Sequence, residues 1–437
     1  MSKPTFLISC PIDTYSGYGS RSRDIVKAII ELDKYEVKIL PQRWGQTPKG
    51  FIQNNPEWGF LSKHILNVQP PNQPEIWMQI TVPNEFQPVG KYNIGCTAGI
   101  ESNIAPGDWI EGCNRMNLIL GSSKHTIDVL KNSKWEKRDK QTNQSQGTLE
   151  WNGENEIIFE GVNTDVYKPV KSTFDLSNIK EEFAYLFVGH WMEGQMGEDR
   201  KNVGLLIKAF YETFKNKSKK PALILKTSTV GSSYLDRDRI LKRVKQIKDS
   251  CKSNNLPNVY LLHGEFSDEE INEIYNHSKV KAMVNLTKGE GFGRPLLEFS
   301  LVNKPIIASN WSGPVDYLNP EFTTLLQGTM TKIHPSAANH MLLADAEWFS
   351  VDTGHVGHYL KDVFENYKGY AENAKRQGFQ SRSKFSYEAM KEKLGNLFAL
   401  KIPEFPKQVQ LQLPKLNKIE LPKLKKIESI MQKEEIS

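Results

Sequence analysis

The sequence predicts an α/β protein built from two domains, each with a parallel sheet. Three observations predict this class. Short β-like apolar runs alternate with helical patterns along the chain, which is typical of parallel strands joined by crossover helices. A glycine-containing loop twice stands between an apolar run and a helical pattern, at residues 16–20 and 289–293. The 437 residues are enough for two domains that each bury a core.

The first domain opens with a predicted strand at residues 5–10, a glycine loop at 16–20 and a helix from Arg21 to about Leu32. A further strand ends within 117–123. Residues 136–155 are polar and without periodicity, so we expect an exposed insertion there.

The second domain is expected to start near Lys168. Its predicted strands cover 184–188, 222–226, 259–264 and 280–286, and its predicted helices cover 202–214, 235–248, 268–276 and 296–302. Either Ser267 or Asp268 is the expected cap of the third of these helices. Residues 370–397 carry apolar and aromatic side chains at helical spacing.

The most informative segment is 289–298, with the sequence GEGFGRPLLE. Its three glycines allow the backbone to come close to a ligand, and the free N–H groups at the start of the following helix form an anion site, with Pro295 in the first turn. Glu290 in the loop and Glu298 on the helix stand eight residues apart. A nucleotide-diphosphate sugar would use every part of this segment if its sugar lay over the glycines and its ribose contacted Glu298. The plain alternative is a strand-loop-helix corner whose glycines serve only the turn.

The spacing of Glu290 and Glu298, with GFG-x-P between them, resembles the signature of retaining nucleotide-sugar glycosyltransferases of the GT-B fold, family 4. Residues 304–314, residues 160–169, and residues 187–189 with 200–210 are similar to further family segments and keep the family order. The resemblance implies two Rossmann-like domains facing a central cleft. It assigns 1–167 to the acceptor domain, 168–385 to the donor domain, 386–400 to a crossover helix that packs back on the first domain, and 401–437 to an extended tail.

The resemblance also implies roles for individual residues. The catalytic set is Glu290, Lys201 and Arg200, and Glu101 is the acceptor-side candidate. The donor-binding set is Gly17, Gly19, His190, Gly264, Gly291, Phe292, Gly293, Arg294 and Glu298. His190 stands where the family has an arginine, so either Arg200 or Arg294 replaces the missing guanidinium. Two plainer alternatives remain: Glu101 caps the next element, and Glu298 faces solvent as helix glutamates usually do.

The implied reaction moves a sugar from a nucleotide-diphosphate sugar to an acceptor hydroxyl with retention of configuration. UDP- and GDP-sugars are the donors expected before others. The donor is a co-substrate, and no further cofactor is expected. A sugar epimerase or phosphorylase on the same fold is the enzymatic alternative. The other alternative is a non-catalytic nucleotide-sugar-binding or scaffold protein, because His190 stands where the family has a catalytic-site arginine. The acceptor stays open among glycan, lipid-linked sugar, protein and modified nucleic acid.

Composition limits the environment and the partners. The formal charge of +6 permits nucleic acid or an anionic membrane surface, but no aromatic-basic motif supports nucleic acid. Four cysteines without a C-x-x-C pair predict a reducing compartment, hence a cytoplasmic protein. The first apolar run is too short for a signal peptide, and no run is long enough to span a membrane. The D-x-D at 236–238 lies in a charged helical stretch, and the histidines lack ligand spacing, so we expect no metal.

The C-terminal tail repeats a Pro-Lys pair every eight residues, at 406–407, 414–415 and 422–423. Proline at each repeat disfavours one long helix. The tail is therefore either an extended segment that docks on a protein or a membrane surface, or a flexible tether.

Overall fold

The computed structural model describes residues 3–68, 70, 72–139, 141–229 and 231–406. The tail repeats therefore lie almost entirely outside the described residues. No helix among the described residues is both long and apolar enough to cross a membrane. All four cysteines are buried and unpaired.

The described chain contains two large parallel sheets, which confirms the predicted fold class. The first sheet has the order β2 (Glu36–Pro41), β1 (Thr5–Cys10), β3 (Ile76–Ile80), β4 (Tyr92–Thr97), β5 (Leu118–Gly121) and β8 (Asn155–Ile157). Its helices are α1 (Gly17–Glu31), α2 (Phe51–Asn54), α3 (Gly107–Asn114) and α4 (Lys124–Asn132). We call this sheet and its helices the N-terminal half.

The second sheet has the order β11 (Val259–Leu262), β10 (Ala222–Lys226), β9 (Ala184–Val188), β12 (Val280–Asn285), β13 (Ile306–Ser309) and β14 (Thr324–Leu326). Its helices are α5 (Val203–Phe214), α6 (Tyr234–Asp249), α7 (Asp268–Asn276), α8 (Arg294–Ser300), α9 (Thr353–Glu365) and α10 (Tyr367–Lys384), with an antiparallel ribbon of β15 (Gly328–Lys332) and β16 (Glu347–Val351). We call this the C-terminal half. The strand order reverses between β9 and β12, and α/β proteins bind ligands at the carboxyl ends of the strands at such a reversal.

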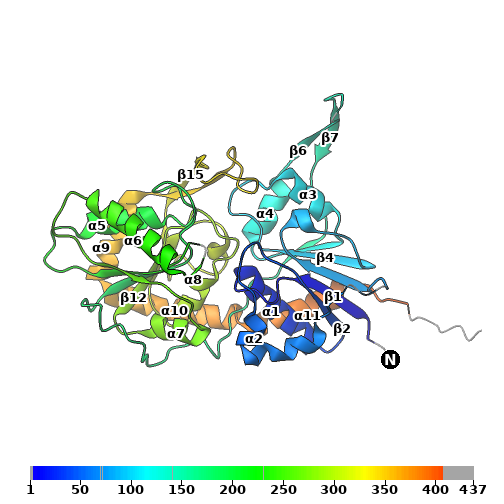
Figure 1. The fold of residues 1–437 in the computed structure, drawn as a ribbon, viewed down its shortest axis with the longest axis horizontal. Helices are drawn as coiled ribbons and strands as arrows, with labels where there is room; N and C mark the ends of the chain where they lie inside the picture. The colour runs from blue at the N-terminus through cyan, green and yellow to red at the C-terminus, as the bar shows by residue number, and fades with distance from the viewer. Residues whose placement is uncertain (1–2, 69, 71, 140, 230, 407–437) are drawn as a thin grey trace, which may run out of the picture. The chain divides into compact units, whose positions relative to one another are not determined.

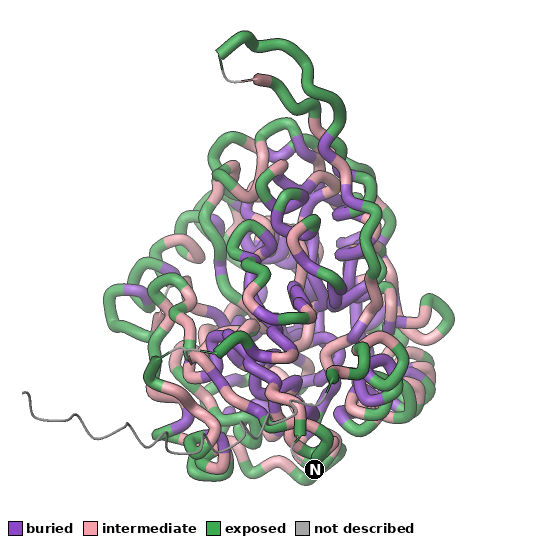
Figure 2. The backbone as a smooth tube through the Cα atoms, turned by 90° about the vertical axis from the view of Figure 1, so that its right-hand side faces the viewer, coloured by how far each residue is buried: buried purple, intermediate pink, exposed green. Residues whose placement is uncertain are grey.

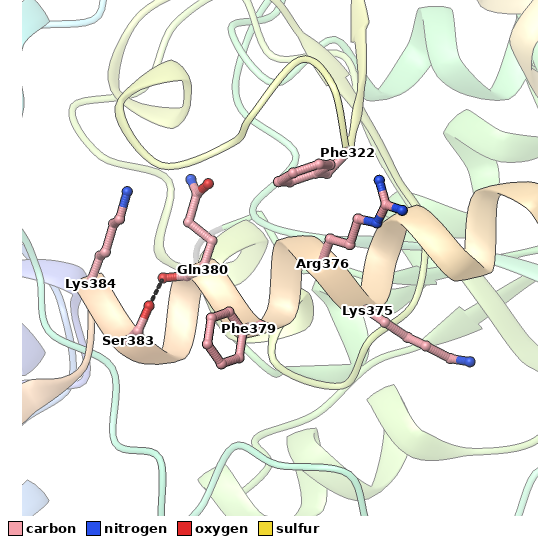
Figure 3. Close-up of a pocket in the computed structure, with 7 residues that line it drawn as sticks. All are labelled: Phe322, Lys375, Arg376, Phe379, Gln380, Ser383 and Lys384. Atoms are coloured by element: carbon pink, nitrogen blue, oxygen red, sulfur yellow. Dashed lines mark hydrogen bonds between the residues drawn. The ribbon is translucent and has the colours of Figure 1, made fainter.

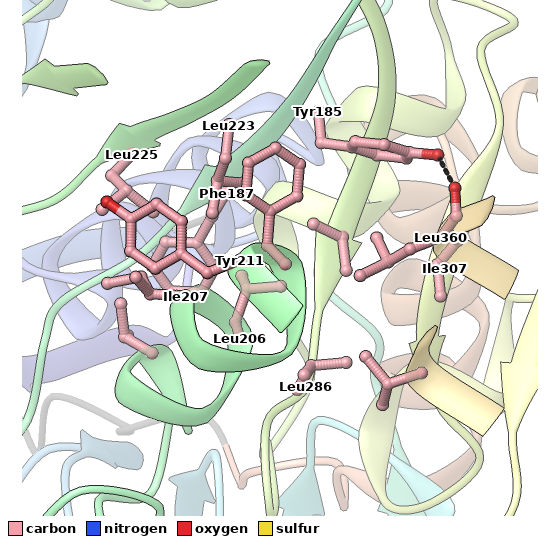
Figure 4. Close-up of a cluster of buried hydrophobic side chains, with 14 of the residues drawn as sticks. Tyr185, Phe187, Leu206, Ile207, Tyr211, Leu223, Leu225, Leu286, Ile307 and Leu360 are labelled. Carbon is pink, nitrogen blue, oxygen red and sulfur yellow. Dashed lines mark hydrogen bonds between the residues drawn. The ribbon is translucent and has the colours of Figure 1, made fainter. Parts of the chain in front are cut away.

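Both faces of the second sheet are covered, so its strands are buried and read as continuous apolar runs. Figure 4 shows the core on one face, where Tyr185 and Phe187 of β9 pack against Leu206 and Ile207 of α5. The Tyr185 hydroxyl donates a hydrogen bond to the Leu360 carbonyl of α9.

Strands β1, β9 and β10 and helix α7 match the predicted bounds residue for residue, and Ser267 is the cap of α7. Helix α1 differs, because it begins at Gly17 and not at Arg21. The Ser16 Oγ accepts a hydrogen bond from the Gly19 N–H at 2.9 Å and starts the helix there. Gly17 and Gly19 therefore belong to the first helical turn and not to a loop.

Residues 136–155 were expected to be an exposed insertion. Residues 136–138 and 141–148 are exposed, and the segment forms an antiparallel hairpin of β6 (Trp135–Arg138) and β7 (Ser145–Leu149), after which β8 joins the first sheet. Figure 2 shows this hairpin exposed at the top of the view. The sequence did not indicate the hairpin, because a hairpin with two solvated faces needs no apolar period. It is anchored only at its base, by the buried Leu149 and by Trp135 Nε1, which donates to the Ala105 carbonyl.

The last helix, α11 (Tyr387–Lys401), lies beside α1 in the N-terminal half (Figure 1). Its Tyr387 hydroxyl is 3.0 Å from the Glu31 carboxylate of α1. The Phe398 ring of α11 packs on Phe6 of β1, with 5.6 Å between ring centroids. Ser386 caps this helix and separates it from α10.

Candidate active site

Two loops meet at the carboxyl edge of the second sheet, where its strand order reverses. One follows β9 and ends with Arg200 and Lys201 just before α5, and the other follows β12 and carries the glycines at 289–293. The Lys288 N–H donates to the Arg200 carbonyl at 2.8 Å and ties the two loops together.

Four of the predicted site residues form one ionic cluster. Glu290 is 7% exposed and forms ion pairs with Lys201 and with Arg200, whose Nη1 lies 3.3 Å from Oε2 of Glu290. The same Arg200 nitrogen donates to the Gly289 carbonyl at 2.8 Å. Glu101 of the N-terminal half lies 3.2 Å from Arg200, so its carboxylate neutralises a site cation and does not serve as a cap.

The Glu290 side chain is held ionised in this cluster. Burial would raise the pKa of Glu290, but the charges of Lys201 and Arg200 outweigh it and lower the pKa below its usual value. The backbone is fixed as well, because the Glu290 N–H donates to the Ser312 hydroxyl at 3.0 Å and its carbonyl accepts from the Gly313 N–H at 3.0 Å. Protein contacts thus hold a carboxylate and two cations together at this edge of the sheet.

Glycines 289 and 291 lie against the backbone of the N-terminal half. A Cβ at Gly289 would lie 2.0 Å from the Glu101 carbonyl oxygen, and one at Gly291 would lie 2.3 Å from that of Ala98. The absence of a side chain at these two positions therefore makes room for that backbone. The hydroxyls of Ser122 and Ser123 donate to the Gly291 carbonyl at 3.0 and 2.6 Å and strengthen this contact.

The remaining loop residues have distinct roles. Gly293 has φ 88°, a left-handed conformation that suits glycine at the start of α8. The Phe292 side chain is 2% exposed and packs on Tyr317 in the core, with 5.0 Å between ring centroids, so the side chain is not available to a donor.

Glu298 is buried and does not face solvent as an isolated helix glutamate would. Its Oε1 accepts from Arg294 Nε at 2.9 Å, and Arg294 Nη1 lies 2.6 Å from the Asp24 carboxylate of α1. Burial raises the pKa of Glu298 to about 7, although Arg294 opposes the rise. Asp24 was not predicted, because nothing in the local sequence of α1 connects it to a residue 270 positions away.

The other predicted residues lie around this cluster or in the first turn of α1. His190 is exposed, and its Nδ1 lies 3.1 Å from the Ser228 hydroxyl. Desolvation and the charges of Lys201 and Lys226 lower the pKa of His190. Gly264 follows β11 at the same sheet edge with φ 150°. A Cβ at Gly17 would meet nothing within 4 Å, whereas one at Gly19 would lie 2.3 Å from the Thr14 carbonyl oxygen.

Sequence reasoning also missed Lys226, Ser122, Ser123 and Ser312. The available signal for Lys226 is its position at the carboxyl end of a parallel strand, β10, next to the strand-order reversal. The serines act through hydrogen bonds to the glycine loop from distant segments, for which the sequence offers no signal.

The D-x-D sequence at 236–238 lies in the first turns of α6, as expected of a polar helix start. The Asp236 carboxylate accepts from the Thr229 N–H at 3.0 Å and lies 2.9 Å from His263 Nε2. Over the described ranges, no group of three or more His, Cys, Asp or Glu side chains is arranged to hold a metal ion.

A separate groove of about 520 Å³ runs along α10 and contains none of the predicted site residues (Figure 3). It is lined by Phe322, Lys375, Arg376, Phe379, Gln380, Ser383 and Lys384.

Residues 180–339 match the family model described as "Glycosyl transferases group 1". A comparison with curated protein sequences found no match. Among solved structures, the chain is similar to a glycosyltransferase from Rickettsia africae ESF-5, with TM-score 0.60, 14% identity, and coverage of 92% of this chain and 99% of that one. It is similar to a sucrose-phosphate synthase from Thermosynechococcus elongatus, with TM-score 0.59, 13% identity, and coverage of 91% and 98%.

It is also similar to Anabaena HepE in complex with UDP and glucose, with TM-score 0.54, 12% identity, and coverage of 91% and 100%. The chain therefore has the GT-B fold of these glycosyltransferases, and its residues 180–339 carry the sequence pattern of group 1 glycosyl transferases.

Proposed function

We propose that this protein is a retaining glycosyltransferase that moves a sugar from a nucleotide-diphosphate sugar to an acceptor hydroxyl. The observation that carries the proposal is the buried cluster of Arg200, Lys201 and Glu290 at the strand-order reversal of the second sheet. The match of residues 180–339 to group 1 glycosyl transferases supports the same reaction class.

The two cations suit a leaving diphosphate. Negative charge accumulates on the diphosphate as the glycosidic bond breaks, so fixed cations there stabilise the transition state more than the ground state. In the structure, Glu290 neutralises Arg200 and Lys201. When the phosphates take over that pairing, the Glu290 carboxylate is free to accept hydrogen bonds from the sugar hydroxyls. It then faces the positive charge that develops at the anomeric carbon.

The second carboxylate, Glu298, would accept hydrogen bonds from the ribose hydroxyls. Its contact with Arg294 orients it and leaves its other oxygen for the ligand. We propose UDP-glucose as the first donor to test, because the similar HepE structure contains UDP and glucose. GDP-sugars are the second choice.

In the proposed single displacement, configuration is retained because the acceptor attacks from the face that the diphosphate leaves. The acceptor oxygen forms its bond to the anomeric carbon as the bond to the phosphate oxygen breaks, and that phosphate oxygen takes the acceptor proton. No protein base is assigned in this scheme.

We infer that Arg200 supplies the guanidinium that the resemblance leaves missing at His190. Arg200 shares Glu290 with Lys201, whereas Arg294 is engaged by Asp24 and Glu298. A charge-assisted contact contributes about 1.5–3 kcal/mol. Arg200→Ala should therefore slow transfer by about one to two decades.

The decisive experiment incubates the full chain with UDP-glucose, then other UDP- and GDP-sugars, and a panel of acceptors, with products identified by mass spectrometry. Glu290→Gln should remove transfer, while Glu321→Gln, an exposed loop glutamate, should not. A product whose anomeric bond is equatorial where that of the donor is axial would contradict retention. Epimerised donor or sugar phosphate without acceptor would indicate the epimerase or phosphorylase. Donor binding without any product would indicate a binding protein.

A further inference from the structure

A stacked pair of aromatic side chains lies in the N-terminal half next to the glycine loop. Tyr18 and Trp44 have ring centroids 4.0 Å apart and an interplanar angle of 24°. Tyr18 follows β1 and Trp44 follows β2, so both lie past the carboxyl ends of neighbouring parallel strands. Both side chains are partly exposed.

The pair is connected to the candidate active site by direct contacts. The Tyr18 hydroxyl lies 3.0 Å from the Thr97 hydroxyl and accepts from the Ala98 N–H at 3.0 Å. The Ala98 carbonyl packs against Gly291. Ala98 lies three residues before Glu101 in the chain. Because its hydroxyl is already bonded, Tyr18 offers its ring and not a polar group to a ligand.

The chain neighbours of the two rings are exposed, Gly17 beside Tyr18 and Gly45 beside Trp44. Farther along the same edge, Phe51 packs on Tyr15 and lies near Trp58. A second aromatic group thus follows the pair in the chain.

The polar groups beside these rings suit an uncharged or weakly charged ligand. Asn54 Nδ2 donates to the Tyr15 hydroxyl at 2.9 Å on the exposed surface, which places an amide and a phenol beside Phe51. Arg23 lies 3.3 Å over the Phe51 ring, but it is 3% exposed and its guanidinium donates to the carbonyls of Ile12 and Thr14. That cation is not available to a phosphate.

We propose that Trp44 and Tyr18 form a platform on which a pyranose ring of the acceptor packs, so that the acceptor is a saccharide. The C–H groups on one face of a pyranose are apolar and pack on an aromatic ring, while its hydroxyls need planar amide, phenol and carboxylate partners. Tyr15, Asn54 and Glu101 provide such partners along this edge.

This proposal rests on the proposed function for the transfer step, but saccharide binding is measured without donor. The full chain is applied to an array of neutral and acidic oligosaccharides, single-stranded oligonucleotides and aromatic glycosides, and hits are titrated by calorimetry. We expect an oligosaccharide to bind. Trp44→Ala should weaken that binding about tenfold or more, and Trp44→Phe should keep it within about threefold, because a smaller ring still stacks.

Tyr234→Ala is the matched control, because Tyr234 is an 88% exposed aromatic residue on α6, far from this platform in the sequence. UDP affinity of each variant reports whether the C-terminal half is intact. Equal saccharide affinity of wild type and Trp44→Ala overturns the proposal, as does binding of oligonucleotides or aromatic glycosides in place of saccharides. Saccharide binding without transfer from any donor would refute the proposed function alone. Transfer to a non-saccharide acceptor would refute the platform alone.

Discussion

Replacing Glu290 by glutamine should destabilise the ligand-free protein and make its stability depend on UDP. The variant removes the negative charge that neutralises Lys201 and Arg200, whose side chains are 14% and 13% exposed. Two cations are then left mostly buried, each with part of its hydration lost. Glutamine has nearly the same shape, so the change is almost purely one of charge.

The structure sets the expected magnitude. Removing one partner of a buried ion pair costs about 3–5 kcal/mol, because the remaining charge is uncompensated. Arg200 keeps its contacts with Glu101 at 3.2 Å and with the Gly289 carbonyl at 2.8 Å, so it loses only part of its charge compensation. Lys201 bears most of the loss. We therefore expect the lower end, about 3 kcal/mol in the free energy of unfolding.

The assay is urea unfolding of wild type, Glu290→Gln and the exposed control Glu321→Gln, each with and without UDP. A ligand that binds only the folded state adds about 2.7 kcal/mol at a concentration of 100 times its Kd. The phosphates replace the lost carboxylate as the partner of the two cations. UDP should therefore bind the variant more tightly than wild type and recover most of the lost stability.

Two results would refute this reasoning. A Glu290→Gln protein as stable as wild type would mean that the two cations do not depend on Glu290 for neutralisation. A destabilised variant that UDP does not rescue would mean that the phosphates do not bind at Arg200 and Lys201.

Three further predictions concern other parts of the structure. Gly291→Ala should lower the free energy of unfolding by about 1–3 kcal/mol, because its Cβ would lie 2.3 Å from the Ala98 carbonyl oxygen; urea unfolding measures this. Tyr185→Phe should cost about 1 kcal/mol without changing UDP affinity, because it removes only the buried hydrogen bond to the Leu360 carbonyl. Glu298 binds its proton more tightly when folded, so its contribution to stability should fall as pH rises from about 4.5 to about 7, and Glu298→Gln should remove that fall.

Each of these has a control. Gly17→Ala fills open space and should be tolerated, so an equal loss in both glycine variants would contradict the steric argument. Tyr234→Phe alters an exposed tyrosine and should leave stability unchanged. For the pH series, Glu321→Gln should follow the wild-type curve. If Glu298→Gln also follows it, the carboxyl group titrates alike in the folded and unfolded states.

The sequence alone predicted the fold class and the positions of most elements. Periodicity is a local property, so apolar runs of strand length and helical spacing predicted β1, β9, β10 and α7 to the residue. Local spacing also predicted that Glu290 lies in a loop and Glu298 on the following helix. Where the local pattern carried no period, at 136–149, the sequence predicted an exposed insertion but gave no sign of the hairpin that it forms.

The tertiary structure alone decided the partners. Glu101 reaches Arg200, Asp24 reaches Arg294, and the serines at 122 and 123 reach the Gly291 carbonyl, across 99 to 270 positions of sequence. A glycine in the sequence indicates that another group comes close to its backbone. Which group that is depends on how the two halves pack. Charge pairing and close approach are properties of distance in space, and no local pattern encodes them.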